Sequence, residues 1–210
     1  MPSSKLDRDP ETTWGYYHKN FVVRRVYFKR LKMALSLAGE QKNRSILDVG
    51  TGSGLMLPSL AGYGVVSAVD SSLEYVARAR KLCHAEKINA DIRHANVDKI
   101  PFADTFFDVI FCLSVLEHVK DLSAAVSELK RLLKKDGMLI VGVPVERIAV
   151  NILFRLFGAS EIVKHVHCSD FMDVEKSLKK QFYIERSVRL PSFVPENFSL
   201  YKVFVCRKIL

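Results

Sequence analysis

The feature that most constrains the fold of this 210-residue chain is a glycine-rich turn that follows a short apolar segment. Residues 46–54 read Ile-Leu-Asp-Val-Gly-Thr-Gly-Ser-Gly. Glycines allow the main chain to turn sharply, and they let a ligand approach it without a Cβ in the way. Asp70 ends the next apolar segment, where a carboxylate can accept hydrogen bonds from both hydroxyls of a ribose. The pattern predicts a nucleotide-like ligand at the edge of an α/β sheet.

Strand-like and helix-like segments alternate from this turn onward. Pro58 predicts a kink or an early end in the short helix after the turn. Ser71 with Glu74 predicts a capping box for the next helix, and Gly137 is expected to close a later one. Apolar strands joined by helices favour a doubly wound, Rossmann-like three-layer sandwich with a mostly parallel sheet. Strands are predicted at 45–49, 64–70, 90–94, 107–113 and 138–143, with longer helices over about 71–84 and 122–133.

The end of the chain departs from this alternation. A helix is predicted over 170–181, and strands over 182–188 and 201–206. The link between the two strands is too short for a helical crossover, so we expect an antiparallel C-terminal strand pair. The chain is long enough for one domain with a full core, which we place at 45–210.

An N-terminal helical extension is expected over 1–44, with helical periodicity from Trp14 to Ala38. The whole chain carries a net charge of +9, and between Lys19 and Arg44 eight basic residues accompany one acid. Such a local field attracts anionic partners such as phosphorylated substrates, RNA or an anionic membrane surface. A solvated helix face explains the same pattern equally well.

Composition and cysteine spacing exclude several classes of protein. Hydrophobic residues make up 49% and charged residues 26%, as in ordinary globular proteins, and no apolar stretch approaches the roughly 20 residues of a membrane span. The four cysteines form no CxxC pair, which predicts neither a zinc site nor a disulfide framework, and we expect no bound metal. The N-terminus carries acids and no apolar core, so we expect no signal peptide and a cytoplasmic location.

The turn can be distinguished from other nucleotide-binding turns by its spacing. Dinucleotide folds use GxGxxG, whereas Leu55 follows Gly54 here. Asp48 lies two residues before the first glycine, where a dinucleotide-binding strand is normally apolar. No GK[ST] follows the turn, so a nucleoside triphosphate is disfavoured. The pattern argues against NAD and more firmly against ATP.

Residues 45–145 resemble the small S-adenosylmethionine (SAM) dependent methyltransferases of class I, the UbiE-like group. Five stretches occur in the family's order and spacing, which is a far more specific signal than the glycine turn alone. They are Ile46–Gly54, Val69–Ser72, Ile100–Val109, Val115–His118 and Glu128–Gly137.

The resemblance implies SAM as cofactor, S-adenosylhomocysteine (SAH) as product, and a role for each matching residue. The glycines would pass beneath the methionine part, with Asp48 helping to hold the turn and the amino group. Asp70 would bind the ribose hydroxyls, and Leu113 would lie by the methyl-donating centre. The implied cofactor-binding residues are Asp48, Gly50, Thr51, Gly52, Gly54, Asp70, Ser71, Asn96, Val97 and Leu113.

Asn96 is a departure from the family pattern. Relatives usually carry an acid there, which accepts a hydrogen bond from the adenine amino group. An amide oxygen can accept the same bond with less charge assistance. Asp98 is the alternative acceptor, and its position favours it less than Asn96.

The sequence indicates less about the methyl acceptor than about the cofactor. SN2 transfer from a sulfonium depends mainly on positioning and needs a base only when the nucleophile arrives protonated. His118 and His167 are the candidate catalytic residues, although the pattern favours a structural role for each. Two segments could shape an acceptor site: Trp14–His18 as a lid, and the apolar stretch 148–157 as a cap or membrane contact, with simple packing as the rival for both.

Three functions remain open at this point. The leading hypothesis is methylation of a small apolar or anionic metabolite. RNA methylation through the basic N-terminal helix is the second, and a non-catalytic SAM-binding protein is the third. The fourth strand does not end in the Asn/Asp-Pro-Pro-Tyr sequence used on planar amino nitrogens of DNA bases and glutamine, which disfavours a DNA substrate.

Overall fold

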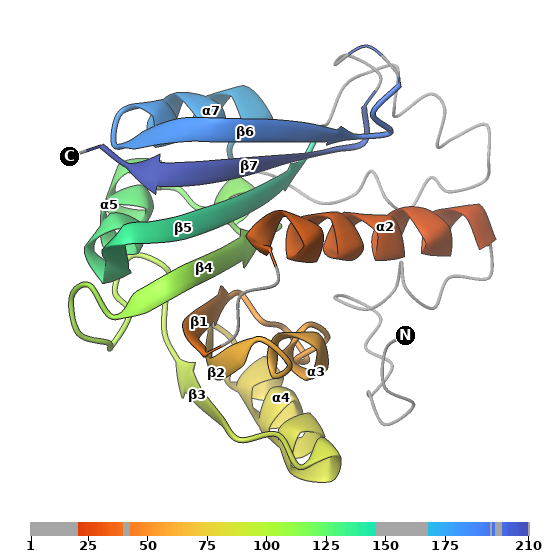
Figure 1. The fold of residues 1–210 in the computed structure, drawn as a ribbon, viewed down its shortest axis with the longest axis vertical. Helices are drawn as coiled ribbons and strands as arrows, with labels where there is room; N and C mark the ends of the chain where they lie inside the picture. Colours follow the sequence, from red (N-terminus) through yellow and green to blue (C-terminus); the bar gives the residue numbers. More distant parts are fainter. Residues whose placement is uncertain (1–20, 40–42, 146–167, 194, 196–198, 210) are drawn as a thin grey trace.

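A seven-stranded sheet organises the computed structural model, which describes residues 21–39, 43–145, 168–193, 195 and 199–209 (Figure 1). The strands lie in the order β3-β2-β1-β4-β5-β7-β6. The first five are parallel, and β7 is antiparallel to both β5 and β6. This confirms the predicted α/β fold with its antiparallel C-terminal pair. The bounds are β1 Arg44–Val49, β2 Gly64–Asp70, β3 Ala90–His94, β4 Phe107–Leu113, β5 Leu133–Pro144, β6 Phe182–Leu190 and β7 Tyr201–Lys208.

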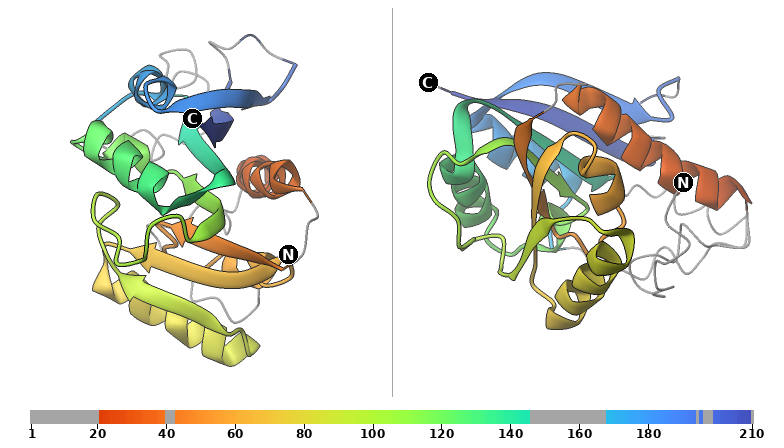
Figure 2. Two further views of the ribbon diagram at one scale, coloured as in Figure 1. Left: turned by 60° about the vertical axis from the view of Figure 1, so that its left-hand side comes forward. Right: turned by 60° about the horizontal axis from the view of Figure 1, so that its bottom comes forward.

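Helices cover both faces of the sheet and create two separate apolar cores (Figure 2). One core joins the sheet to α2 (Phe21–Ala38), α3 (Leu57–Leu60) and α4 (Leu73–Glu86). The other joins it to α5 (Leu122–Leu132) and α7 (Phe171–Lys179), with the short 3-10 helix η1 (Leu116–His118) after β4. Burial on both faces explains why the central strands read as continuous apolar runs.

The carboxyl ends of β1, β2 and β4 meet at one edge of the sheet. The register pairs Val49 of β1 with Val69 of β2 and Cys112 of β4. On the other side of β4, Leu113 pairs with Gly142 of β5. Ligands bind at this edge in open α/β sheets, because the turns that follow parallel strands gather there.

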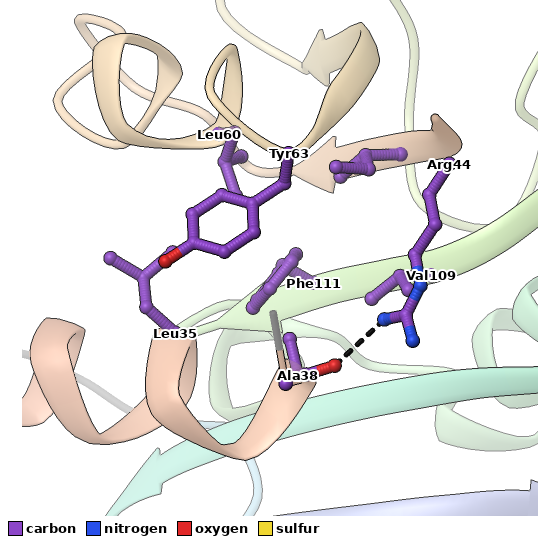
Figure 3. Close-up of a pocket in the computed structure, with 9 residues that line it drawn as sticks. Leu35, Ala38, Arg44, Leu60, Tyr63, Val109 and Phe111 are labelled. Atoms are coloured by element: carbon purple, nitrogen blue, oxygen red, sulfur yellow. Dashed lines mark hydrogen bonds between the residues drawn. The ribbon is translucent and has the colours of Figure 1, made fainter. Parts of the chain in front are cut away.

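Helix α2 lies against the sheet and extends past the ends of β4 and β5 (Figure 1). Its buried face includes Ala34 and Ala38, whose small side chains allow close packing. Near its C-terminal end, Arg44 Nη1 donates a 2.7 Å hydrogen bond to the carbonyl oxygen of Ala38. Figure 3 shows the small pocket beside this contact, lined mainly by apolar side chains from α2, β1 and β4. Because Arg44 begins β1, the pocket lies away from the carboxyl edge and belongs to the attachment of α2.

Three local predictions were wrong in detail. The N-cap of α4 is Ser72, not Ser71, because Asp70 Oδ1 accepts a bond from the Ser72 N–H (2.9 Å) and extends the strand conformation by one residue. Pro58 lies in the first turn of α3 and marks its start, where the missing N–H costs nothing. Gly137 lies inside β5, which begins directly after α5.

The remaining boundaries agree closely with the predicted segments. Helix α7 begins after Asp170, whose carboxylate accepts from the Met172 and Asp173 N–H groups. The part of the N-terminal extension before residue 21 lies outside the described residues. Within the described residues, no helix is both long and apolar enough to cross a membrane. Cys83, Cys112 and Cys206 are buried as free thiols, and Cys168 is exposed as a free thiol.

Candidate functional site

The turn after β1 is held in place by β2. The N–H groups of Gly50 and Thr51 both donate to the carbonyl oxygen of Val69, at 2.9 and 3.1 Å. Gly50, Gly52 and Gly54 all have positive φ, at 70°, 55° and 88°. Residues with a side chain rarely adopt this left-handed conformation, so three alternate glycines are what such a turn requires.

Asp70 braces the same turn from the end of β2. Its Oδ2 accepts a hydrogen bond from the Gly52 N–H (2.8 Å), and its Oδ1 accepts one from the Ser72 N–H (2.9 Å). A carboxylate offers about four lone-pair positions, so two positions remain for other donors. The side chain is thus fixed in place and able to accept from a pair of hydroxyl groups.

Two of the glycines also have a packing reason. A Cβ on Gly50 would lie 2.2 Å from Val115 Cγ2, and one on Gly54 would lie 3.3 Å from the Cα and Cβ of Ala79 in α4. Gly50 therefore lets the segment after β4 approach the turn, and Gly54 lets α4 approach it. Ligand access therefore explains only part of the need for glycine at these two positions.

Asp48 lies beneath the turn and is buried, with only 4% of its surface exposed. Thr51 Oγ1 donates a 2.8 Å hydrogen bond to its Oδ2. Burial raises the pKa of Asp48 to about 7, the bond from Thr51 opposes this rise, and the nearby charge of Asp70 adds to it. A cation bound beside the turn would favour the ionised form of this carboxyl.

A second buried acid lies close to the same place. Glu117 of η1 is 2% exposed. Burial raises the pKa of Cys112 well above its usual range, and the charges of Glu117 and Asp48 raise it further. The carboxyl groups of Asp48 and Glu117 both act on Cys112, so they lie near one another at this end of the sheet. Such an environment suits a ligand that carries positive charge.

The residues present fit SAM. Asp70 offers acceptors for ribose hydroxyls, and Asp48 offers a carboxyl to a positively charged group. Ser53 Oγ in the turn is buried, and within the described residues it has no hydrogen-bond partner. An unsatisfied buried hydroxyl is costly in an isolated protein, and a polar ligand at the turn would relieve that cost. Ser71, at the end of β2, is exposed, and its carbonyl oxygen lies 2.9 Å from His94 Nε2.

Asn96 lies at the same edge, directly after β3. The preceding residue, Ala95, donates its N–H to the carbonyl oxygen of Asp70 at 3.0 Å. The Asn96 side chain is exposed, and Val97 beside it is half-buried against the core. The segment of Asn96 and Val97 thus lies beside the end of β2. Residues that bind the same nucleoside would have to lie close together in this way.

We expect Asn96→Asp to preserve or tighten SAH binding. If Asn96 accepts the adenine amino group, a charged acceptor makes that bond stronger by up to about twofold in energy. Calorimetric titration of SAH into wild type and variant measures this directly. Asp98→Asn is the matched control, since Asp98 is also exposed and lies two residues away. A large loss in Asn96→Asp together with a loss in Asp98→Asn would assign the adenine contact to Asp98.

The two candidate catalytic histidines are placed unequally. His118 ends η1 and is exposed, after the strand whose carboxyl end borders the turn. His167 lies outside the described residues, as do Trp14–His18 and the segment 148–157. Leu113, the last residue of β4, is half-buried at the same edge as the turn. Among the described ranges, no three His, Cys, Asp or Glu side chains converge as a metal site would require.

A shallow groove lies beside the site. It runs between α2 and the residues that follow Gly54, and its walls are mainly apolar. Leu55 and Met56 connect it to the turn, and among the described residues that line it Lys32 is the charged one. Its lining residues are Phe28, Leu31, Lys32, Leu35, Leu55, Met56, Pro58 and Ser59.

Comparison with known proteins agrees with this geometry. Residues 47–141 match the family described as "Methyltransferase domain". A ubiquinone biosynthesis O-methyltransferase of Glaesserella parasuis is 32% identical over 129 residues, which cover 58% of this chain and 53% of that protein. The chain spans about half the length of the curated relatives it matches first.

Solved structures share the fold over nearly the whole chain. A Pyrococcus horikoshii protein aligns with a TM-score of 0.73 and 19% identity, covering 95% of this chain and 98% of its own. A geranyl diphosphate C-methyltransferase of Streptomyces coelicolor, solved with Mg²⁺, geranyl diphosphate and SAH, aligns with a TM-score of 0.69 and 16% identity. That alignment covers 100% of this chain and 91% of the other.

Proposed function

We propose that this chain is a class I SAM-dependent methyltransferase that transfers a methyl group from SAM to a small-molecule acceptor. When bound, SAM supplies a methyl group on a positively charged sulfur, and a lone pair of the acceptor takes that methyl group as the sulfur regains its electron pair. The chain's own residues bind and orient the two reactants, which is the main requirement of such a transfer.

The observation that carries the proposal is the position of Asp70. Its carboxylate fixes the glycine turn through Gly52 and keeps acceptor positions for two hydroxyls at the edge where ligands bind. The buried carboxyl of Asp48 supports a positively charged cofactor, because a positive charge beside the turn would favour its ionised form.

The groove beside the turn supports a small-molecule acceptor. Its mainly apolar lining suits an apolar group of an acceptor. The names of the curated relatives make an oxygen acceptor the first to test. For a hydroxyl nucleophile, His118 is the described candidate for the base, at the rim of the same edge.

Calorimetry with SAH and with NAD tests the cofactor. We expect SAH to bind and NAD not to bind, because Asp48 and the GxGxG spacing leave no place for a pyrophosphate on the turn. Incubation with labelled SAM and a panel of hydroxylated, amino and carbon-acid acceptors then identifies the acceptor atom. Absence of SAH binding would refute the proposal.

RNA methylation is the second candidate, because α2 contains five basic residues and no acid. Arg25, Lys29 and Lys32 are exposed on it. RNA binding whose affinity falls steeply between low and physiological salt would favour this candidate over a small molecule. SAH binding without methyl transfer to any member of the acceptor panel or to RNA would favour a non-catalytic SAM-binding protein.

A further inference from the structure

A short turn after β3, residues 96–99, carries the residues expected to bind the cofactor's adenine, and we call it the Asn96 turn. The Lys99 N–H donates a 3.1 Å hydrogen bond to the carbonyl oxygen of Asn96, which closes the turn. Val97 is partly buried against the core, and the other three residues are exposed. Packing therefore constrains this turn mainly at Val97, so the hydrogen bonds at its two ends are important for its position.

Both ends of the Asn96 turn are tied to other parts of the fold. Just before it, the Ala95 N–H donates a 3.0 Å hydrogen bond to the carbonyl oxygen of Asp70. Just after it, the Ile100 N–H donates a 2.7 Å hydrogen bond to Glu128 Oε1. The first bond joins the turn to the end of β2, and the second joins it to α5. Glu128 is therefore the side chain that fixes the second end of the turn.

Arg131 holds Glu128 in the orientation that this bond requires. The two residues lie three positions apart on α5. Arg131 Nε donates to Glu128 Oε2 and Arg131 Nη2 donates to Glu128 Oε1, both at 2.8 Å. A bidentate pair of this kind fixes the plane of the carboxylate as well as its position. The hydrogen bond from Arg131 lowers the pKa of Glu128 although burial opposes this, so the carboxylate stays ionised at neutral pH.

The other N–H groups of Arg131 hold the segment that follows the turn. Nη2 donates to the carbonyl oxygen of Ile100 and Nη1 to that of Phe102, each at 3.0 Å. Nη1 also donates to Asp104 Oδ1. A guanidinium has five N–H donors, and with the two bonds to Glu128 all of them are used. A lysine in this position would keep the positive charge but could not reproduce the planar set of donors.

A second arginine supports the same segment from β3. Arg93 Nη1 donates to the carbonyl oxygen of Pro101, and the Arg93 Cζ lies 4.1 Å from the centre of the Phe102 ring. These contacts do not involve α5, because Arg93 belongs to β3. We therefore expect variants of Arg131 to displace the Asn96 turn while the segment after it stays attached to the sheet.

We propose that Glu128 and Arg131 are positioning residues for recognition of the cofactor's adenine. Neither side chain contacts the cofactor in this assignment. Arg131 orients Glu128, and Glu128 fixes the Asn96 turn through the main chain of the next residue. Hydrogen bonds weaken steeply when donor and acceptor are misaligned, so a small displacement of the turn weakens the bond between Asn96 and the adenine amino group. This assignment rests on the proposed function for the identity of the ligand as SAM or SAH.

Binding of SAH and of its 6-deamino analogue tests the assignment. The analogue carries hydrogen in place of the adenine amino group, so the ratio of the two affinities, measured by calorimetric titration, reports on the contact with that group. We expect wild type to prefer SAH by about 3- to 10-fold, and Arg131→Lys and Glu128→Ala to lower this preference to less than about twofold. If both ligands instead weaken by the same factor and the preference is unchanged, the role of the pair is purely structural and the assignment is overturned.

Two other variants serve as controls. Glu128→Gln keeps an oxygen acceptor for the Ile100 N–H, so we expect it to retain more of the preference than Glu128→Ala. Arg207→Lys removes a comparable contact, the 2.7 Å hydrogen bond from Arg207 Nε to Glu185 Oε2, near the end of β7 and away from the carboxyl edge. We expect Arg207→Lys to retain the wild-type preference. Equal losses of preference in Arg207→Lys and Arg131→Lys would count against the assignment.

Amide hydrogen exchange of the ligand-free protein tests the anchor of the turn without any cofactor. We expect the Lys99 and Ile100 amides to exchange faster in Glu128→Ala than in wild type, because the acceptor of the Ile100 N–H is removed. The Ala95 amide, which donates to the carbonyl oxygen of Asp70, should keep its protection. Equal exchange at Ile100 in the two proteins would overturn the assignment.

Failure of this assignment and failure of the proposed function give different results. Absence of SAH binding in wild type would refute the proposed function, whereas amide exchange at Ile100 would still report on the anchor. SAH binding in wild type without any preference over the deamino analogue would leave the proposed function intact and overturn the role of the Asn96 turn in adenine recognition.

Discussion

Replacing Asp70 with alanine should lower the affinity for SAH by about 100-fold or more. The variant removes a charged acceptor from two ribose hydroxyls, and each such hydrogen bond contributes about 1.5–3 kcal/mol. It also removes the bonds to the Gly52 and Ser72 N–H groups, so the turn itself loses its brace. Both effects weaken binding, and calorimetric titration of SAH measures their sum.

Unfolding of the ligand-free variant separates a lost contact from a lost fold. We expect Asp70→Ala to remain folded with a reduced midpoint, because the cores on either side of the sheet do not depend on this side chain. Asp91→Ala is the control, since Asp91 is an exposed acid on β3 that pairs with Arg93. SAH affinity equal to wild type in a folded Asp70→Ala protein would refute the placement of the ribose.

The second large effect concerns stability and pH. We expect the ligand-free wild type to lose about 3 kcal/mol of unfolding free energy between pH 5 and pH 8, relative to Asp48→Asn. The pKa of Asp48 is raised to about 7 in the folded state, mainly by burial. Between the ordinary Asp value and 7, the folded state holds a proton that the unfolded state has released, so stability falls as pH rises. Asparagine keeps an acceptor for Thr51 and has no charge to bury.

Urea denaturation at a series of pH values measures this difference. Asp108→Asn is an informative control, because the pKa of Asp108 is shifted the other way. Burial would raise the pKa of Asp108, but hydrogen bonds from Lys134 and Ser45 outweigh it and lower the pKa. Its contribution is lost only in acid, so the Asp108→Asn and wild-type curves should run parallel from pH 5 to 8. If the Asp48→Asn and wild-type curves also run parallel over this pH range, the prediction that ionised Asp48 is buried at a cost in stability is wrong.

Most of the fold could be predicted because its signals are local. Apolar runs of strand length and amphipathic helices fixed the element order, and the short link before β7 predicted its antiparallel direction. The errors occurred where two local signals compete. Ser71 has the spacing of a capping box with Glu74, yet Ser72 caps the helix because Asp70 holds its N–H in an extended conformation.

The residues proposed to bind the cofactor could be singled out in the sequence for the same reason. Asp48, the glycines and Asp70 lie within 23 residues, and their spacing carries the chemistry. The contacts of Arg30 and Tyr201 with Ser114 gave no such signal. The contact between Arg30 and Ser114 spans 84 residues, and nothing in the basic helix distinguishes Arg30 from its exposed neighbours. The sequence predicts only that Tyr201 lies in a strand. Its contact with Ser114 depends on a glycine in another strand, which leaves room for the tyrosine ring.

The reversed direction of β7 has a consequence for how such a protein can diversify. A parallel strand brings its last residue to the site edge, whereas β7 brings its first residue, Tyr201. Residues at this edge can therefore be exchanged at the start of β7, while the turn after β1 stays intact. Grafting this hairpin between related proteins would change the residues at that edge without changing the turn after β1.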